Sequence, residues 1–225
     1  MRKTTVASII LATALSSGVL AAGAARAADL IPYPNSGDYN AVTYTFTATS
    51  TGDLIAYIVG GFSAGFENEL GLLVNGTAQG GFGLNNHASA LGDSYNFGSV
   101  TAGDTLTFVL HNIGYGQDAY SDPSLNVAYD GPDYVGGHNH IYSTAYTADP
   151  ALGSVPVGVY VGFEDLPFSG TDFNYDDESF VFTNTTSVAV DGGVPEPAAW
   201  AMMLTGFFGL GATLRGRRRR GALAA

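Results

Sequence analysis

Between residues 42 and 190 the chain consists of short apolar runs separated by glycine, asparagine and aspartate. Val42, Tyr44 and Phe46 alternate with threonines, and this period of two predicts a half-buried β-strand. No segment combines a helical period with helix caps. Eight or more short strands at this spacing predict an all-β fold, an antiparallel β-sandwich or jelly roll. The other predicted strands are 54–59, 70–74, 105–110, 141–146, 155–161, 179–183 and 187–190.

Turn residues mark the ends of several of these strands. Asn75 and Gly76 follow strand 70–74 and favour a two-residue hairpin turn. Residues 101–104 predict a turn into the next strand, and residues 80–86 predict a glycine-rich loop. The chain has no cysteine, so disulfides, thiol nucleophiles and thiolate metal sites are excluded.

Charge is segregated along the chain. Residues 28 to 214 contain all twenty carboxylates and no lysine or arginine, which gives this segment a formal charge of −20. We therefore expect cations as partners, and neither nucleic acid nor anionic membrane surfaces. The eight basic residues lie at the two ends of the chain: Arg2, Lys3, Arg26, Arg215, Arg217, Arg218, Arg219 and Arg220.

The N-terminal end has the three parts of a secretory signal peptide. Arg2 and Lys3 form the charged region, residues 6–20 are apolar or small, and Ala25-Arg26-Ala27 matches an A-x-A cleavage site. We predict a signal peptide at 1–27, followed by an acidic β-sandwich domain at 28–190. An uncleaved anchor is the alternative.

The C-terminal end, residues 191–225, predicts a membrane segment. Seventeen uncharged residues, 198–214, follow Pro195, Glu196 and Pro197 and precede an arginine-rich tail at 215–220. At about 1.5 Å per residue a helix of this length reaches about 26 Å, which suffices for a thin bilayer. The arginines would hold its end in the cytoplasm and leave the domain outside. A nucleic-acid-binding tail would not need the apolar run.

This ending resembles the PEP-CTERM sorting signal of Gram-negative bacteria. The resemblance implies that Pro195, Glu196 and Pro197 are recognised by an exosortase, a membrane protein that removes the helix and tail. It also implies export through the inner membrane to the cell surface, outer membrane or extracellular matrix. PEP-CTERM systems accompany exopolysaccharide production, so a place in a biofilm is expected.

The most acidic stretch lies at 162–182, between two predicted strands. Asp172, Asn174 and Asp176 are spaced so that alternate oxygens of a tight loop can converge on a hard cation such as calcium. The full EF-hand pattern is not present. We predict one calcium site here, and a solvated acidic loop is the alternative. The candidate ligands are Glu164, Asp165, Asp172, Asn174, Asp176 and Asp177.

The same stretch resembles a domain of unknown function found in exported bacterial proteins. GFEDLP at 162–167, DFNYDD at 172–177 and FVF at 180–182 are similar to that family's GFEDL and D-x-D-Y-N-D runs. Asn174 stands where an aspartate is commoner in the family. The resemblance implies a calcium-binding-like β-module.

Three other patterns suggest different chemistry. Residues 61–65 match the G-x-S-x-G nucleophile elbow around Ser63, but a strand, not the required helix, is predicted to follow. Glu164 and Asp172 could form a glycosidase pair.

His138 and His140 could share a transition metal, with His111 or His87 as a third ligand. Exposed loop histidines are favoured over this metal site, and a bond from His140 to a carboxylate near the acidic loop is a further alternative.

We therefore expect a structural or adhesive surface protein and no enzymatic activity. A carbohydrate-binding module is the alternative, and a secreted hydrolase is a weaker one. A sugar-binding module would use exposed aromatic side chains as a stacking surface. The tyrosines considered for that surface are Tyr115, Tyr120, Tyr129 and Tyr134.

Overall fold

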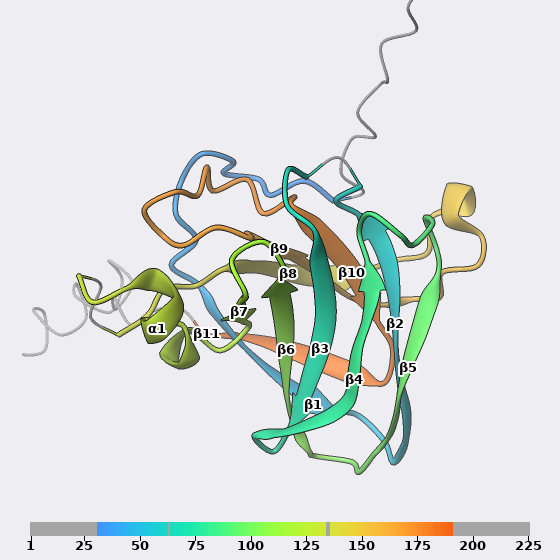
Figure 1. Ribbon diagram of the computed structural model, residues 1–225. Coiled ribbons are helices and arrows are strands. Elements are labelled where there is room, and N and C mark those ends of the chain that lie inside the picture. The colour runs from blue at the N-terminus through green and yellow to red at the C-terminus, as the bar shows by residue number, and fades with distance from the viewer. Residues whose placement is uncertain (1–30, 63, 134–135, 191–225) are drawn as a thin grey trace, which may run out of the picture.

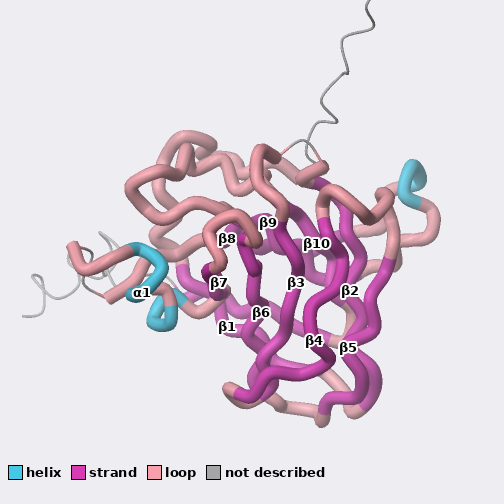
Figure 2. Tube along the Cα trace, viewed as in Figure 1, coloured by secondary structure: helices cyan, strands magenta, loops and turns pink. Residues whose placement is uncertain are grey.

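The computed structural model describes residues 31–190, apart from residues 63, 134 and 135 (Figure 1). Two antiparallel sheets face each other in this part of the chain, and loops join them at both ends (Figure 2). The predicted all-β class is confirmed. The predicted signal peptide, the sorting motif and the predicted helix 198–214 lie outside the described residues. In the described part, no helix is long and apolar enough to span a bilayer.

Sheet A has the strand order β11-β1-β6-β3-β4, and β7 also pairs with β6. Its strands are β1 (Thr43–Ala48), β3 (Asn68–Val74), β4 (Thr77–Asn85), β6 (Thr105–Asn112), β7 (Gln117–Tyr120) and β11 (Thr185–Val190).

Sheet B has the order β5-β2-β10-β9-β8. Its strands are β2 (Gly52–Gly60), β5 (Ser94–Val100), β8 (Ile141–Tyr146), β9 (Gly158–Phe163) and β10 (Glu178–Phe182). The helical segments among the described residues are short: α1 (Val127–Asp130) and two 3-10 turns, Pro123–Leu125 and Pro150–Leu152.

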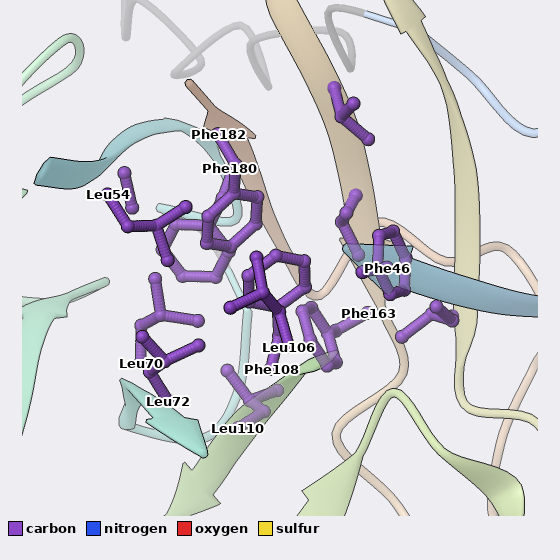
Figure 3. Packing of buried hydrophobic residues seen from close by; sticks show 14 of the residues in the cluster. Phe46, Leu54, Leu70, Leu72, Leu106, Phe108, Leu110, Phe163, Phe180 and Phe182 are labelled. Carbon is purple, nitrogen blue, oxygen red and sulfur yellow. The ribbon is translucent and has the colours of Figure 1, made fainter. Parts of the chain in front are cut away.

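The main core lies between the two sheets and follows from the period of two along the strands. Alternate residues of β6 and β10 point inward, and the rings of Phe108 and Phe182 stack at 3.7 Å between centroids. Figure 3 shows these rings packed with Phe180 and with leucines such as Leu70. A second, smaller cluster of buried side chains, including Tyr160 and Val181, lies on the outer face of sheet B.

Most of the predicted strands are present, with shifted ends, and three expectations need correction. The predicted loop 80–86 is wrong, because residues 77–85 form strand β4. Gly80 and Gly81 take positive φ angles there, and a register shift lets the strand continue through them. Strands β5 and β7 are additional to the predicted ones, because the alternation of Tyr95 and Phe97 in β5 is interrupted at Gly98 and β7 has only four residues. Strand β9 begins at Gly158, not at residue 155.

The inward-facing rows of both sheets change from apolar to polar at one end of the sandwich. On β3 and β6 the row ends in Asn68 and Asn112, which pair with each other. On β10 it ends in Glu178, which pairs with Phe163 of β9. We call Asn68, Asn112 and Glu178 the polar layer. The loop 164–177 between β9 and β10 covers this end, which we call the acidic end (Figure 1).

We expect Phe182→Ala to lower the free energy of unfolding by about 3–5 kcal/mol, because the ring is fully buried and its removal leaves a cavity against Phe108. The change should appear in urea unfolding followed by circular dichroism. The exposed Val188 on edge strand β11 offers a matched control, with an expected change within about 0.5 kcal/mol for Val188→Ala. Equal effects of the two substitutions would contradict this packing.

Candidate functional site

The acidic loop is held against the segment that precedes β1. Gly37 N donates a hydrogen bond to Phe173 O at 3.1 Å, and Asn40 N donates to the hydroxyl of Tyr175 at 2.9 Å. Tyr175 is buried, with a ring contact to Tyr33. Figure 1 shows the loop and the N-terminal segment side by side at the acidic end. The loop is therefore anchored from outside as well as by its own residues.

The predicted Asp-x-Asn-x-Asp run forms two successive turns. Asp172 Oδ1 and Oδ2 accept hydrogen bonds from the backbone N and the Nδ2 of Asn174, at 3.3 and 2.9 Å. Asn174 Oδ1 in turn accepts from Asp176 N at 3.0 Å. The two intervening residues, Phe173 and Tyr175, have positive φ angles of 57° and 58°. The alternate side chains thus stabilise a tight loop, and Asp172 remains exposed to solvent.

Glu164 closes the base of this loop. Its side chain is buried, and its carboxylate accepts hydrogen bonds from the Thr171 hydroxyl and from Tyr175 N at 2.5 Å. Burial raises the pKa of Glu164, the two hydrogen bonds oppose this, and the carboxylate of Asp172 raises it further. Asp172 therefore lies within electrostatic reach of Glu164.

Asp165 and Asp177 form the next pair of carboxylates. Asp165 N donates to Asp177 Oδ2 at 3.0 Å, and Asp165 Oδ2 accepts from Asn68 Nδ2 at 2.8 Å. Asp165 O accepts from Asn112 Nδ2 and from the Tyr129 hydroxyl. Burial raises the pKa of both carboxyls, and the neighbouring Asp165 and Glu164 help to raise that of Asp177 to about 8. Two carboxyl groups this close cannot both ionise cheaply without a cation.

The structure brings together part of the predicted ligand set. Glu164, Asp165 and Asp177 lie at the base of the loop, and Asp172 acts electrostatically on both Glu164 and Asp165. The side chain of Asn174 is used in the hydrogen bonds that stabilise the two turns, and Asp176 takes part in these turns through its backbone N–H. Within the part of the chain that is described, no three histidine, aspartate or glutamate side chains are positioned to hold one metal ion. A cation here would also have to use amide or carbonyl oxygens.

His138 and His140 converge on one carboxylate, that of Asp130 at the end of α1. His140 Nε2 lies 2.7 Å from Asp130 Oδ1, and His138 Nδ1 lies 3.3 Å from Oδ2. Asp130 also accepts from His138 N and from Phe168 N of the acidic loop. Burial alone would raise the pKa of Asp130, but the hydrogen bond and charge of His140, with the two N–H groups, lower it overall.

This arrangement corrects one expectation and supports another. His140 is buried, so its interpretation as an exposed loop residue is wrong. Its bond to a carboxylate beside the acidic loop is confirmed, because Asp130 contacts Phe168. The two histidines do share a partner, and that partner is Asp130.

The remaining candidates are Ser63 and the four tyrosines, of which Ser63 and Tyr134 lie outside the described residues. A nucleophile elbow needs a helix directly after the serine, but the next regular element is strand β3, which begins at Asn68. Among the considered tyrosines, Tyr129 is buried and Tyr115 is exposed, while Tyr134 is not described. Tyr120 is half-buried. A stacking surface needs exposed rings, so Tyr129 cannot contribute to one.

Sequence reasoning did not identify the partners that come from outside the acidic stretch. Asn68, Asn112, Tyr129 and Asp130 reach the loop from three other segments. Glu178 lies in the stretch but was not a candidate ligand. A usable signal existed for Asn68 and Asn112, because each continues the inward-facing apolar row of a strand with a polar residue.

Comparisons with known proteins add no relative: no protein-family model matches the chain, and searches of curated proteins and of solved structures gave no match.

We expect the protein without calcium to lose stability as the pH rises from about 5 to about 8. The folded-state pKa of Asp177 is about 8, above the unfolded value of about 3.9. The folded state therefore holds this proton more tightly, and that advantage disappears as the pH rises through the window. Asp165 and Glu164 act with the same sign, because their pKa values are also raised. The lowered pKa of Asp130 acts only at more acidic pH.

Thermal melts in EDTA across this pH range would measure the effect. The melting temperature should fall by several degrees in the wild type and by less in Asp177→Asn, which cannot ionise. Identical profiles for the two proteins would show that Asp177 titrates normally.

Proposed function

We propose that this protein is an exported, exosortase-processed surface or matrix protein whose β-sandwich binds calcium and has a structural or adhesive role. The observation that carries the proposal is the concentration of carboxylates at the acidic end. Glu164 and Asp165 are buried there, Asp177 lies beside them, and residues 28 to 214 supply no lysine or arginine to neutralise them. A cation is the natural counter-charge.

Calcium fits the donors that the loop presents. It takes six to eight oxygen ligands in flexible geometry and accepts carboxylate, amide and carbonyl oxygens alike. The proposed ligands are Glu164, Asp165, Asp172, Asn174, Asp176 and Asp177. Bound calcium would neutralise these charges and tie the loop to strands β9 and β10. The hydrogen bonds of Glu164 and Asp172 hold the loop in its conformation and so position the proposed ligands.

The sorting signal supports the location. Pro195, Glu196 and Pro197 follow the last described strand, β11, by only a few residues. We infer that the signal peptide directs export and that the segment 198–214 holds the protein in the inner membrane until the exosortase removes it. The association of such signals with exopolysaccharide points to a role at the cell surface or in the biofilm matrix.

We expect calcium to raise the melting temperature of the EDTA-treated protein in a saturable way. A ligand that binds only the folded state contributes about 2.7 kcal/mol at 100 times its dissociation constant, or about 5–10 °C for a domain of this size. Magnesium should act much less, and Asp172→Ala with Asp176→Ala should abolish the calcium effect. Thermal melts monitored by circular dichroism would measure the shifts.

Asp53→Ala with Asp133→Ala removes the same charge from exposed positions outside the loop and should keep the calcium effect. Weak and equal effects of calcium and magnesium would show that the loop is only a solvated acidic surface. Carbohydrate binding would then be the favoured function.

Replacement of Pro195, Glu196 and Pro197 by alanine should block processing in a host that makes an exosortase. The unprocessed form should accumulate in the inner membrane and run as a larger band on an immunoblot. Asp191→Ala, just outside the motif, serves as the control and should be processed normally. Normal processing of the triple variant would rule out the motif as the recognition sequence.

A further inference from the structure

We propose that Glu178 and Asn68 form an inter-sheet site for a divalent cation of calcium size, distinct from the ion at the Asp-x-Asn-x-Asp run. Asp165, at the base of the acidic loop, contributes to both sites. Neither Glu178 nor Asn68 belongs to the Asp-x-Asn-x-Asp run. The first lies on β10 of sheet B and the second on β3 of sheet A, so an ion between them would link the two sheets.

Strand alternation places both side chains in the same space. Leu70 and Leu72 of β3 belong to the core between the sheets, so Asn68 points inward as well. Phe180 and Phe182 of β10 belong to the same core. The pairing of β10 with β9 is regular from Glu178 to Phe182, so Glu178 points inward too. Both residues occupy the acidic end of their rows.

Asn68 is held in place by hydrogen bonds from its backbone and its side chain. Its backbone N donates to Asn86 Oδ1 at 2.9 Å, and its Nδ2 donates to Asp165 Oδ2 at 2.8 Å. Asn86 is itself fixed by a hydrogen bond from its Nδ2 to Phe66 O. These bonds orient the Asn68 amide, so that its Oδ1 is the atom left over.

Three buried acceptor oxygens of these two residues have no hydrogen-bond partner among the residues that the structure describes. They are both carboxylate oxygens of Glu178 and Oδ1 of Asn68, and both residues are 0% exposed. Leaving such groups unsatisfied is costly, and more so for a charged carboxylate than for a neutral acceptor. Burial, followed by the charges of Asp165, Glu69 and Asp177, raises the pKa of Glu178 well above its ordinary value.

Two arrangements could relieve this cost, and they differ in how many of the three oxygens they satisfy. A protonated Glu178 can donate its one O–H to Asn68 Oδ1, which leaves its own carbonyl oxygen without a partner. A cation can bind both Glu178 oxygens, Asn68 Oδ1 and a carboxylate oxygen of Asp165 at once, and it removes the repulsion between the two acids. Magnesium usually keeps several waters, for which a fully buried position is unsuitable, so calcium is the better fit.

The test is calcium titration of the EDTA-treated full-length protein in detergent, followed by isothermal titration calorimetry. The wild type should bind two calcium ions per chain, and Glu178→Gln should lose one of them or weaken it by at least about tenfold. Glutamine keeps the shape of a protonated glutamate. Full calcium binding by Glu178→Gln would therefore show that Glu178 is simply protonated, and would overturn the site.

Glu67→Gln is the matched control, because Glu67 is exposed one residue before Asn68 and its loss should leave both ions bound. Circular dichroism would check that each variant is folded. If Glu178→Gln does not fold, Asn68→Ala replaces it in the titration. Binding of both calcium ions with wild-type affinity by Asn68→Ala overturns the proposal, and loss of one ion supports it.

The inter-sheet site rests on Glu178 and Asn68, which are not among the loop ligands of the proposed function, and the titrations distinguish failure of one site from failure of the other. Asp172→Ala with Asp176→Ala should remove only the loop ion and keep the ion that depends on Glu178. A wild type that binds one ion, lost in the loop variant and kept in Glu178→Gln, overturns the inter-sheet site alone. One ion with the opposite dependence supports the inter-sheet site and overturns the loop ligands.

Discussion

Burial of carboxylates without cationic side chains is the constraint on which the acidic end of this protein depends. Glu164, Asp165 and Glu178 are each at most 2% exposed, and residues 28 to 214 contain no lysine or arginine. Removing an ionised carboxylate from water is expensive unless hydrogen bonds or a positive charge replace the lost solvation. The loops at this end are arranged around that requirement.

The buried acids meet this requirement in different ways, and the difference separates structural roles from candidate ligands. Asp130 accepts hydrogen bonds from two histidines and two backbone N–H groups, so its charge is satisfied within the fold. Glu164 accepts from Thr171 and Tyr175 and closes the loop. Glu178 has no hydrogen-bond partner for either oxygen within the described part of the chain. We therefore regard Asp130 as structural and Glu178 as the acid most in need of a cation.

Calcium binding would also contribute stability to a β-sandwich that has no cysteine. Secreted domains often rely on disulfides, which this chain cannot form. The aromatic core between the sheets supplies one source of stability, as the stacking of Phe108 on Phe182 illustrates. Ions that bind only the folded state would supply another, at the end where the core becomes polar.

The sequence alone determined the all-β class, most of the strands and the location of the acidic loop, because alternation and turn residues are local properties. Strand 141–146 has its predicted ends, and Asn75 and Gly76 form the expected hairpin. Only the tertiary structure decided which polar residues meet. Asn68 reaches Asp165 across 97 residues, and His140 turns inward to Asp130. Such contacts depend on how the two sheets pack against each other. This packing cannot be predicted from the local pattern of residues along the chain.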